Sequence, residues 1–274
     1  MPELPDLEII KEVLSRHLIG QPIEAVIVRR PIVLRILEPG ATAQAFLEGR
    51  TVTEVARRAK FLLFTLDNGA YIAINPMLGG RLRYCPRGER SLTRDYMLLH
   101  LANGMDLRYN DPEGMGKIYL TRDLGAVPGY AELGPEALDP ALTPDAFLER
   151  LRRHHGEIKG ILTRGVVIAG IGNAYADEIL FRAGIYPFRK QTSLSVEERA
   201  SLYAAMRAVL SEAIEVLRQR MGEEIHIEIR DFLQVHNKKG QPCPRCGHPI
   251  SEIRVAKRAT NFCRHCQPGT LVHT

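Results

Sequence analysis

Four of the five cysteines form two Cys-x-x-Cys pairs near the C-terminal end of the sequence. Each pair lets a tight turn present two thiolates to one ion, and the second pair completes the tetrahedron of a closed structural zinc site. Such a site has no open coordination position, so we expect one zinc ion that supports the fold and does not catalyse. The predicted ligands are Cys243, Cys246, Cys263 and Cys266.

Basic residues lie between the two cysteine pairs, namely Arg254, Lys257 and Arg258. The metal is therefore expected to hold a basic hairpin towards a partner. Lys and Arg together number 37 against 32 for Asp and Glu, which gives a net charge of +5 and a pI near 9.0. This modest excess is compatible with a polyanion, although many basic proteins bind no nucleic acid.

The 274 residues suffice for two domains with a sizeable core. No apolar run approaches the length of a membrane span, and the N-terminus lacks the features of a signal peptide. With four cysteines assigned to metal, we expect a reducing cytoplasm, and Cys85 is left as a reduced, buried thiol.

The chain begins with a predicted helix over residues 5–18, in which Leu7, Ile10, Leu14 and Leu18 share one face. Packing of that face would also fix the position of the first residues of the chain. From 22 to 120 the sequence changes to short β-type runs, with hairpin turns expected at 67–69 and 103–104. This pattern predicts an antiparallel sandwich or barrel.

Residues 125–144 are rich in Pro, Gly and Ala and are expected to form a linker. Beyond it the sequence predicts helices: one capped by Thr143 or Asp145, another beginning near residue 156, and a long amphipathic helix over 195–220. Gly170 and Gly172 form a turn before a further helix, where exposed N–H groups could bind phosphate. Helix–helix turns use glycine routinely, so this signal alone is weak.

Three segments, in this order along the chain, together resemble one family. Residues 2–5 (PELP) are similar to its catalytic terminus, and residues 170–180 (GIGNAYADEIL) to its helix–two-turn–helix segment. Residues 243–267, with Arg258, are similar to its zinc finger. The family is that of formamidopyrimidine-DNA glycosylase and endonuclease VIII, the base-excision repair enzymes, and the resemblance runs essentially from end to end.

The resemblance implies an α+β fold: an N-terminal antiparallel β-sandwich flanked by an N-terminal helix, then a helix–two-turn–helix domain with a β-hairpin zinc finger. The expected limits are 1–130 for the catalytic domain, 131–142 for the linker, 143–235 for the helical DNA-binding domain and 236–274 for the zinc finger. The partner would be damaged double-stranded DNA, with no membrane, and the protein would be a cytoplasmic, nucleoid-associated monomer.

The resemblance also implies a reaction: removal of an oxidised or ring-opened base and strand cleavage by β- or β,δ-elimination. The amine of Pro2 would attack C1′ of a flipped nucleotide, which requires removal of Met1. An α-amino group titrates near ~8 against ~10.4 for lysine, so more of it is unprotonated at neutral pH. Glu3 would be the general acid/base, and Asp6 occupies the position of a second family acid.

The DNA-contacting residues implied by the resemblance are Lys60, on a strand beside the lesion, Asn173 and Arg258 at the phosphates, and Lys159 as a further contact. Contacts of this kind position the strand without reading its sequence. On residue type alone, Lys60 could equally be a surface charge.

The lesion-recognition region departs from the family pattern. Residues 113–115 read Glu-Gly-Met where formamidopyrimidine-type enzymes carry Arg-Arg-Phe, and Leu78 replaces an intercalating methionine. Met115 could still act as an apolar wedge, whereas Glu113 cannot mimic arginine. Asn75 stands in place of a histidine.

Two further departures lie in the C-terminal half of the chain. Arg164 stands in place of a glutamine, and residues 221–240 leave little room for the loop that caps 8-oxoguanine. We therefore expect a lesion preference different from that of an 8-oxoguanine enzyme: oxidised pyrimidines, ring-opened purines, hydantoins or abasic sites.

Two alternatives from other functional classes remain at this stage. A catalytically inactive DNA-damage-binding protein would keep the fold, but binding alone does not need an N-terminal amine. A zinc-ribbon RNA-binding or ribosome-associated factor would explain the finger and the charge, but not the N-terminal motif.

Overall fold

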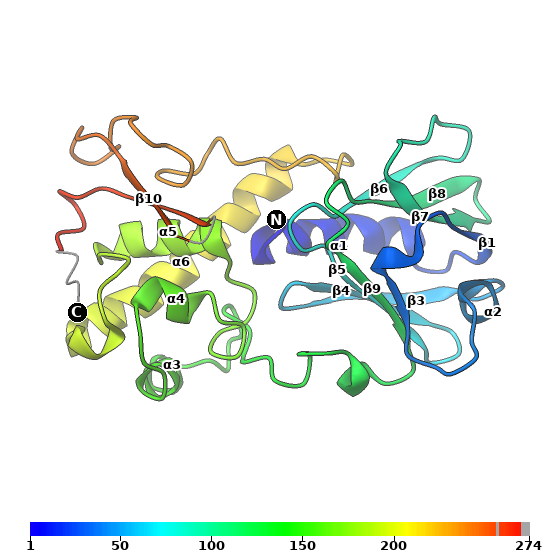
Figure 1. Cartoon of the computed structure of the whole chain (residues 1–274), viewed down its shortest axis with the longest axis horizontal. Coiled ribbons are helices and arrows are strands. Elements are labelled where there is room, and N and C mark those ends of the chain that lie inside the picture. Colours follow the sequence, from blue (N-terminus) through cyan, green and yellow to red (C-terminus); the bar gives the residue numbers. More distant parts are fainter. Residues whose placement is uncertain (256–257, 270–274) are drawn as a thin grey trace. The chain divides into compact units, whose positions relative to one another are not determined.

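The computed structural model describes residues 1–255 and 258–269, and these divide into two compact units (Figure 1). Unit 1 comprises residues 1–132 and 216–228, and unit 2 comprises 133–215 and 229–274. Residues 216–228 thus pack with unit 1, although the sequence limits assign them to the helical domain. Lys257, one of the three basic residues expected on the hairpin, lies outside the described residues.

Unit 1 begins with α1 (Leu4–Leu18), which confirms the predicted helix. Its start is fixed by a reciprocal capping box between Glu3 and Asp6, in which the Asp6 carboxylate accepts from the Glu3 N–H at 2.8 Å. The predicted apolar face is buried and packs against β3 and β4. Burial of this face therefore holds the start of the chain in one position.

The strands of unit 1, all of whose residues are described, form two sheets (Figure 1). The four-stranded sheet has the order β1-β7-β8-β6 and the five-stranded sheet the order β2-β9-β5-β4-β3. The turns expected at 67–69 and 103–104 join β4 to β5 and β7 to β8, and Gly69 and Gly104 there have positive φ. The bounds are β1 Ile23–Val28, β2 Leu34–Ile36, β3 Val52–Arg58, β4 Phe61–Leu66, β5 Tyr71–Asn75, β6 Arg81–Pro86, β7 Asp95–Leu101, β8 Met105–Asn110 and β9 Lys117–Thr121.

One strand pair departs from the antiparallel prediction. β2 pairs with β9 in parallel, with Leu34 opposite Ile118, whereas the other strand pairs of unit 1 are antiparallel. β2 has only three residues and follows a 3-10 turn, η1 (Pro31–Val33), so it is too short to show the alternating pattern that predicts a strand. The short helix α2 (Ala43–Leu47), capped by Thr42, was not predicted either.

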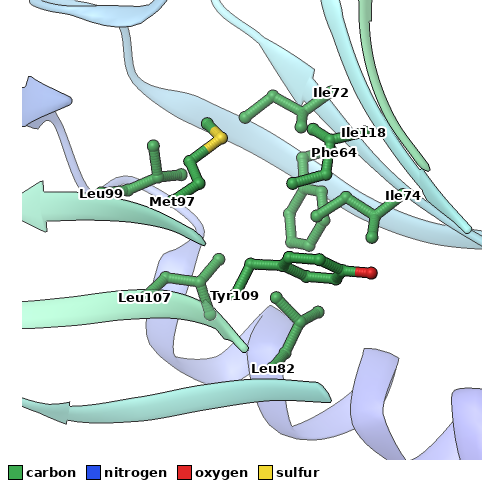
Figure 2. A pocket seen from close by; sticks show the side chains of 9 residues that line it. All are labelled: Phe64, Ile72, Ile74, Leu82, Met97, Leu99, Leu107, Tyr109 and Ile118. Atoms are coloured by element: carbon green, nitrogen blue, oxygen red, sulfur yellow. The ribbon is translucent and has the colours of Figure 1, made fainter. Parts of the chain in front are cut away.

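The two sheets pack face to face around an apolar core. Side chains from both sheets surround a small cavity of about 10 Å³ that is lined almost entirely by carbon (Figure 2). Such a volume is at most that needed by a single water molecule, so a nucleobase cannot bind there. Its lining residues are Phe64, Ile72, Ile74, Leu82, Met97, Leu99, Leu107, Tyr109 and Ile118.

Unit 2 is mainly helical. Its helices are α3 (Pro144–Arg152), α4 (Ile158–Leu162), α5 (Asn173–Ala183) and α6 (Val196–Arg220), the last of which ends in unit 1. The Thr143 hydroxyl caps α3 by accepting from the Ala146 N–H, as predicted. None of the helices in the described part of the chain combines the length and apolar character needed to cross a membrane.

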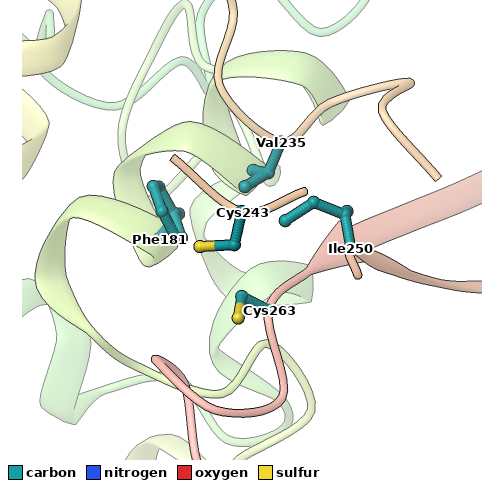
Figure 3. Close-up of a cluster of buried hydrophobic side chains, with 5 residues drawn as sticks. All are labelled: Phe181, Val235, Cys243, Ile250 and Cys263. Atoms are coloured by element: carbon teal, nitrogen blue, oxygen red, sulfur yellow. The ribbon is translucent and has the colours of Figure 1, made fainter. Parts of the chain in front are cut away.

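The hairpin of β10 (Ser251–Val255) and β11 (Arg258–Phe262) is joined to α5 by a small apolar cluster (Figure 3). Phe181 of α5 packs with Val235, Ile250 and two cysteines. A cluster of this size contributes little stability by itself, so the hairpin needs further support. The four cysteines of the predicted metal site are in the right place to give it.

Candidate functional site

The N-terminus joins a proline to a buried acid. Pro2 is buried, and Glu3 is the N-cap of α1 with only 2% of its surface exposed. Asp6 bonds the backbone of Glu3, so its role here is to fix the helix start. With Met1 present the Pro2 nitrogen is an amide, whose lone pair is delocalised and not nucleophilic.

The terminal amine of Met1 lies in a small charge cluster. It pairs with the carboxylate of Glu228 at 3.4 Å, and Arg81, the first residue of β6, pairs with the same carboxylate. These groups are partly exposed, so each pair contributes at most about 1 kcal/mol. Their structural effect is to hold the 221–228 segment beside the chain terminus within unit 1.

Lys60 lies in a hairpin turn, which corrects its expected position on a strand. Arg58 and Phe61 are paired, so Ala59 and Lys60 form a two-residue loop between β3 and β4. Ala59 has a φ of +54°, as the tight turns that match strand twist require. Lys60 is therefore presented at the end of the sheet and is half-buried.

Two loops of unit 1 carry the residues predicted to fill the DNA stack. Leu78 lies between β5 and β6 and is 54% exposed, while Met115 lies between β8 and β9 and is 42% exposed. Glu113, on the second loop, is also exposed. The loops touch, because a Cβ added at Gly79 would lie 2.9 Å from Cγ of Glu113.

The predicted phosphate-contacting residues of unit 2 meet at the start of β11. Asn173, the first residue of α5, donates its side-chain amide to the Ala259 carbonyl at 2.8 Å. Arg258, next to Ala259 in the chain, is exposed. The glycine turn therefore brings the N-terminus of α5 beside the basic hairpin.

Lys159, expected as a further phosphate contact, makes its contacts inside unit 2. Its ammonium lies 2.6 Å from the Asp177 carboxylate and donates to the Thr260 hydroxyl at 2.9 Å and the Ala259 carbonyl at 3.1 Å. The residue is 7% exposed, so its ammonium is surrounded by protein acceptors, two of which it bonds and one of which neutralises its charge. This geometry argues against a phosphate contact and makes Lys159 an anchor of the hairpin.

Sequence reasoning missed a second anchor, on α5. The Glu178 carboxylate accepts from the backbone N–H groups of residues 234, 235 and 236 at 2.8–2.9 Å. Burial raises the pKa of Glu178, although these N–H groups oppose the shift. His236 also bonds Asp177 at 2.8 Å, so two adjacent acids fasten the segment that leads to the zinc finger. The sequence did not indicate that Asp177 and Glu178 would be buried, because most acids of a charged chain lie on its surface.

The four predicted zinc ligands converge. Their sulfur atoms all lie within 4.8 Å of one another, with Cys243–Cys266 at 3.8 Å and Cys246–Cys263 at 3.4 Å. Zn–S bonds of about 2.3 Å give tetrahedral S–S separations of about 3.8 Å, so the residues fit a zinc ion. Burial and the neighbouring thiols raise the pKa of Cys266, so this thiol stays protonated when no cation is near. A bound cation is therefore needed to hold the sulfur atoms together as thiolates.

The β-sandwich unit begins with a proline, which becomes a terminal amine when Met1 is removed, beside a buried acid. The helical unit carries a hairpin with four cysteines. Together these features define a zinc-finger DNA glycosylase. Sequence profiles of known domains match the chain in the same order. They are the "Formamidopyrimidine-DNA glycosylase N-terminal domain" over residues 1–118, the "Formamidopyrimidine-DNA glycosylase H2TH domain" over 133–224 and the "Zinc finger found in FPG and IleRS" over 240–269. The chain belongs to the formamidopyrimidine-DNA glycosylase family.

Individual relatives agree with this assignment. The formamidopyrimidine-DNA glycosylase of Symbiobacterium thermophilum is 38% identical over 98% of this chain and 90% of its own length, and that of Pelotomaculum thermopropionicum is 36% identical over 97% and 99%. The MutM (Fpg) crystal structure from Thermus thermophilus has a TM-score of 0.84 at 34% identity, covering 97% of this chain and 98% of that one. The Lactococcus lactis Fpg bound to DNA containing an abasic site gives 0.88 at 27% identity, covering 97% and 100%.

Family membership makes the chain a base-excision repair DNA glycosylase with AP lyase activity. Nothing in these comparisons favours the catalytically inactive alternative. The profile match at residues 240–269 also agrees with one structural zinc ion on the cysteine cluster.

Proposed function

We propose that Pro2 is the nucleophile of this glycosylase and AP lyase once Met1 has been removed, and that Glu3 is its general acid/base. The observation that carries the proposal is the sequence Pro2-Glu3 at the start of α1, with the Glu3 side chain only 2% exposed. A buried acid adjoining the terminal amine has the reach to move protons during attack.

The reaction then proceeds through the terminal amine. The unprotonated nitrogen of Pro2 bonds C1′ of the flipped nucleotide, and the electrons of the N-glycosidic bond leave with the base, which takes up a proton. The bonded nitrogen then loses its own N–H proton, which frees the lone pair that opens the sugar ring. Glu3 protonates the ring oxygen as the sugar opens, which leaves an iminium between Pro2 and C1′. Loss of a C2′ proton then expels the 3′ phosphate by β-elimination, and a second elimination removes the 5′ phosphate where δ-elimination follows.

The experiment that tests this proposal is borohydride trapping on abasic-site DNA, with the N-terminus of the protein established by mass spectrometry. Borohydride reduces the iminium to a stable amine, so the processed protein should become covalently joined to the DNA. Absence of any adduct with a confirmed Pro2 terminus would refute the proposed chemistry.

We also propose that Lys60, Asn173 and Arg258 contact the phosphates around the flipped nucleotide, while Lys159 anchors the hairpin from inside unit 2. The zinc, held by the four cysteines, supplies no step of the reaction and stabilises the hairpin that carries Arg258. Support comes from the exposure of Arg258 and from the contacts of Lys159 and Asn173 on the next two residues of β11.

The phosphate contact of Arg258 predicts a change in salt dependence. Each neutralised phosphate contributes a slope of about −0.9 to log affinity against log salt, so Arg258→Ala should make the slope shallower by about one. Fluorescence anisotropy with a duplex containing an abasic analogue measures this. Arg254→Ala is the matched control, because Arg254 is exposed on the same hairpin but paired with Glu252 at 2.8 Å. Equal slopes for the two variants would contradict the assignment.

For the lesion, we propose a preference other than 8-oxoguanine opposite cytosine. Support comes from Glu113 and Leu78 on the exposed loops, and from the 221–240 segment, which has no helix or strand. The Lactococcus lactis relative has been solved with DNA that contains Fapy-dG, a ring-opened purine. A panel of duplexes should give faster release of ring-opened purines, hydantoins or oxidised pyrimidines than of 8-oxoguanine. Efficient cytosine-selective 8-oxoguanine excision as the main activity would overturn this preference.

We also propose that the protein is monomeric, cytoplasmic and nucleoid-associated, that it has no membrane partner, and that its domains span residues 1–130, 131–142 (the linker), 143–235 and 236–274. Support for the first boundary comes from the division between Glu132 and Leu133. Sedimentation of the free protein and of its DNA complex tests the monomer.

A further inference from the structure

Asp111 lies at the centre of the loop that carries Met115. Its carboxylate is fully buried, and Oδ1 accepts from the backbone N–H groups of Glu113 at 3.2 Å and Gly114 at 3.0 Å. Oδ2 accepts from the Gly116 N–H at 2.7 Å. One side chain therefore bonds three of the next five residues and determines the path of the loop.

The same carboxylate is backed by Tyr109. The Tyr109 hydroxyl donates to Oδ2 of Asp111 at 3.5 Å. Burial raises the pKa of Tyr109, and the adjacent Asp111 raises it further, so the phenol stays protonated and remains a donor. The other edge of the loop is held by Arg94, whose backbone carbonyl accepts from the Asp111 N–H at 3.0 Å and whose guanidinium donates to the Pro112 carbonyl.

The loop that carries Leu78 packs directly on this pair. A Cβ added at Gly79 would lie 2.7 Å from Oδ1 of Asp111, and one added at Gly80 would lie 2.2 Å from the Tyr109 hydroxyl. On the other loop, a Cβ at Gly116 would lie 1.6 Å from the same hydroxyl. Only glycine fits at these three positions, because both backbones approach the Asp111–Tyr109 pair closely.

Leu78 is held outward by its own turn. The Asn75 side-chain oxygen accepts from the Met77 N–H at 3.1 Å, and the Gly80 N–H donates to the Pro76 carbonyl at 2.9 Å. Met77 adopts a φ of +50°, which is uncommon for a residue other than glycine and persists only where the surroundings determine it. The residue after this strained position, Leu78, is 54% exposed.

We propose that Asp111 is a positioning residue that joins the two loops into one rigid wedge, with Leu78 and Met115 as its apolar edge, and that this wedge enters the base stack as the damaged base leaves. The inference rests on the proposed function, and it deepens the account of how that site extrudes a base. Apolar side chains inserted between base steps offset the stacking that is lost when a nucleotide is flipped. They do so only when held in a fixed direction, which is what the buried carboxylate achieves.

The test compares two activities of Asp111→Asn under single-turnover conditions: release of a ring-opened purine from a duplex, and cleavage of a preformed abasic site. In asparagine, an NH2 group replaces one carboxylate oxygen and faces a loop N–H group, which is also a donor. At least one of the hydrogen bonds between residue 111 and the loop is therefore lost. Because an abasic nucleotide has no base to extrude, the ratio of base release to abasic cleavage should fall about tenfold. Asp123→Asn is the matched control, since Asp123 bonds the Gly125 N–H in another loop of unit 1 and should leave the ratio unchanged.

A double-mutant cycle separates positioning from general damage to the fold. If Asp111 acts through the wedge, Asp111→Asn should change the ratio less than about twofold in a protein already carrying Leu78→Ala and Met115→Ala. Equal loss in both backgrounds, or equal loss of the two activities, would overturn the inference. Should Asp111→Asn fail to fold, the surface variant Leu78→Ala/Met115→Ala alone must lower the ratio, and an unchanged ratio would also overturn it. Lack of both activities in the unmodified protein would instead refute the proposed function.

Discussion

Replacing Pro2 with glycine in the processed protein should lower the yield of borohydride-trapped adduct on abasic-site DNA by about 10²-fold, because the terminal amine is still present but has lost the ring that orients it. Either amine loses one proton after attack and then forms a cationic iminium. The proline iminium has no N–H proton left and so stays cationic, whereas the glycine iminium can lose a second proton and become a neutral, less electrophilic imine. The proline ring is also buried at the start of α1, so glycine leaves the amine less well oriented.

Pro5→Ala provides the matched control for this substitution. Pro5 is a buried proline in the first turn of the same helix, and its replacement changes the helix start without touching the terminal amine. Trapping by Pro5→Ala should therefore stay near that of the unmodified protein. If Pro2→Gly were trapped as efficiently as its parent, the proline ring would not be needed for attack, and peptide mapping of the adduct would then show whether the glycine amine or a lysine such as Lys60 is the nucleophile.

The state of Met1 gives an internal check on the same argument. While Met1 is attached, its own amine pairs with Glu228, and the Pro2 nitrogen is a peptide amide. A mixture of processed and unprocessed chains should thus contain adduct only on the processed form, which the masses of the trapped and free proteins distinguish.

Local chemistry explains what the sequence predicted well. The 3.6-residue spacing of Leu7, Ile10 and Leu14 marks the buried face of α1, and Asn-Gly or Asp-Asn-Gly turns identify two hairpins. Cysteine spacing identifies a site whose sulfur atoms do converge. In each case the signal lies within a few residues, or in a rare residue type that has few other uses.

Long-range contacts explain the errors. The parallel pairing of β2 with β9 joins Leu34 to Ile118, and nothing in three partly exposed residues encodes that partner. Lys159 was expected as a further phosphate contact on the strength of the resemblance, and nothing in the sequence indicated that Asp177 on the next helix would pair with it at 2.6 Å. Likewise the roles of Asp111 and Glu178 exist only after folding, because their carboxylates accept from backbone groups that carry no sequence signature.

Removal of the zinc should lower the affinity for lesion-bearing DNA by at least about 10³-fold, because structural zinc contributes about 10–16 kcal/mol to the folding of small finger modules. The hairpin has only a small apolar cluster of its own, and Arg258 lies at the start of its second strand. Lys159 bonds Ala259 and Thr260, and Asn173 bonds Ala259, but these three contacts cannot replace four metal–sulfur bonds. The expected result is a protein with a folded unit 1 and a loosened hairpin.

Cys263→Ser and Cys85→Ala separate this effect from the loss of any buried thiol. Cys263 is fully buried among the ligands, whereas Cys85 is buried in β6 and takes no part in the cluster. Metal analysis should find one zinc per chain in Cys85→Ala and much less in Cys263→Ser, and anisotropy should show weak DNA binding by the latter alone.

Because the nucleophile belongs to unit 1, Cys263→Ser should still form the borohydride adduct when the DNA concentration is raised above its weakened Kd. Wild-type affinity in a zinc-free protein would show that the hairpin is held by its protein contacts alone, and complete loss of the adduct at saturating DNA would show that the metal also maintains the amine site.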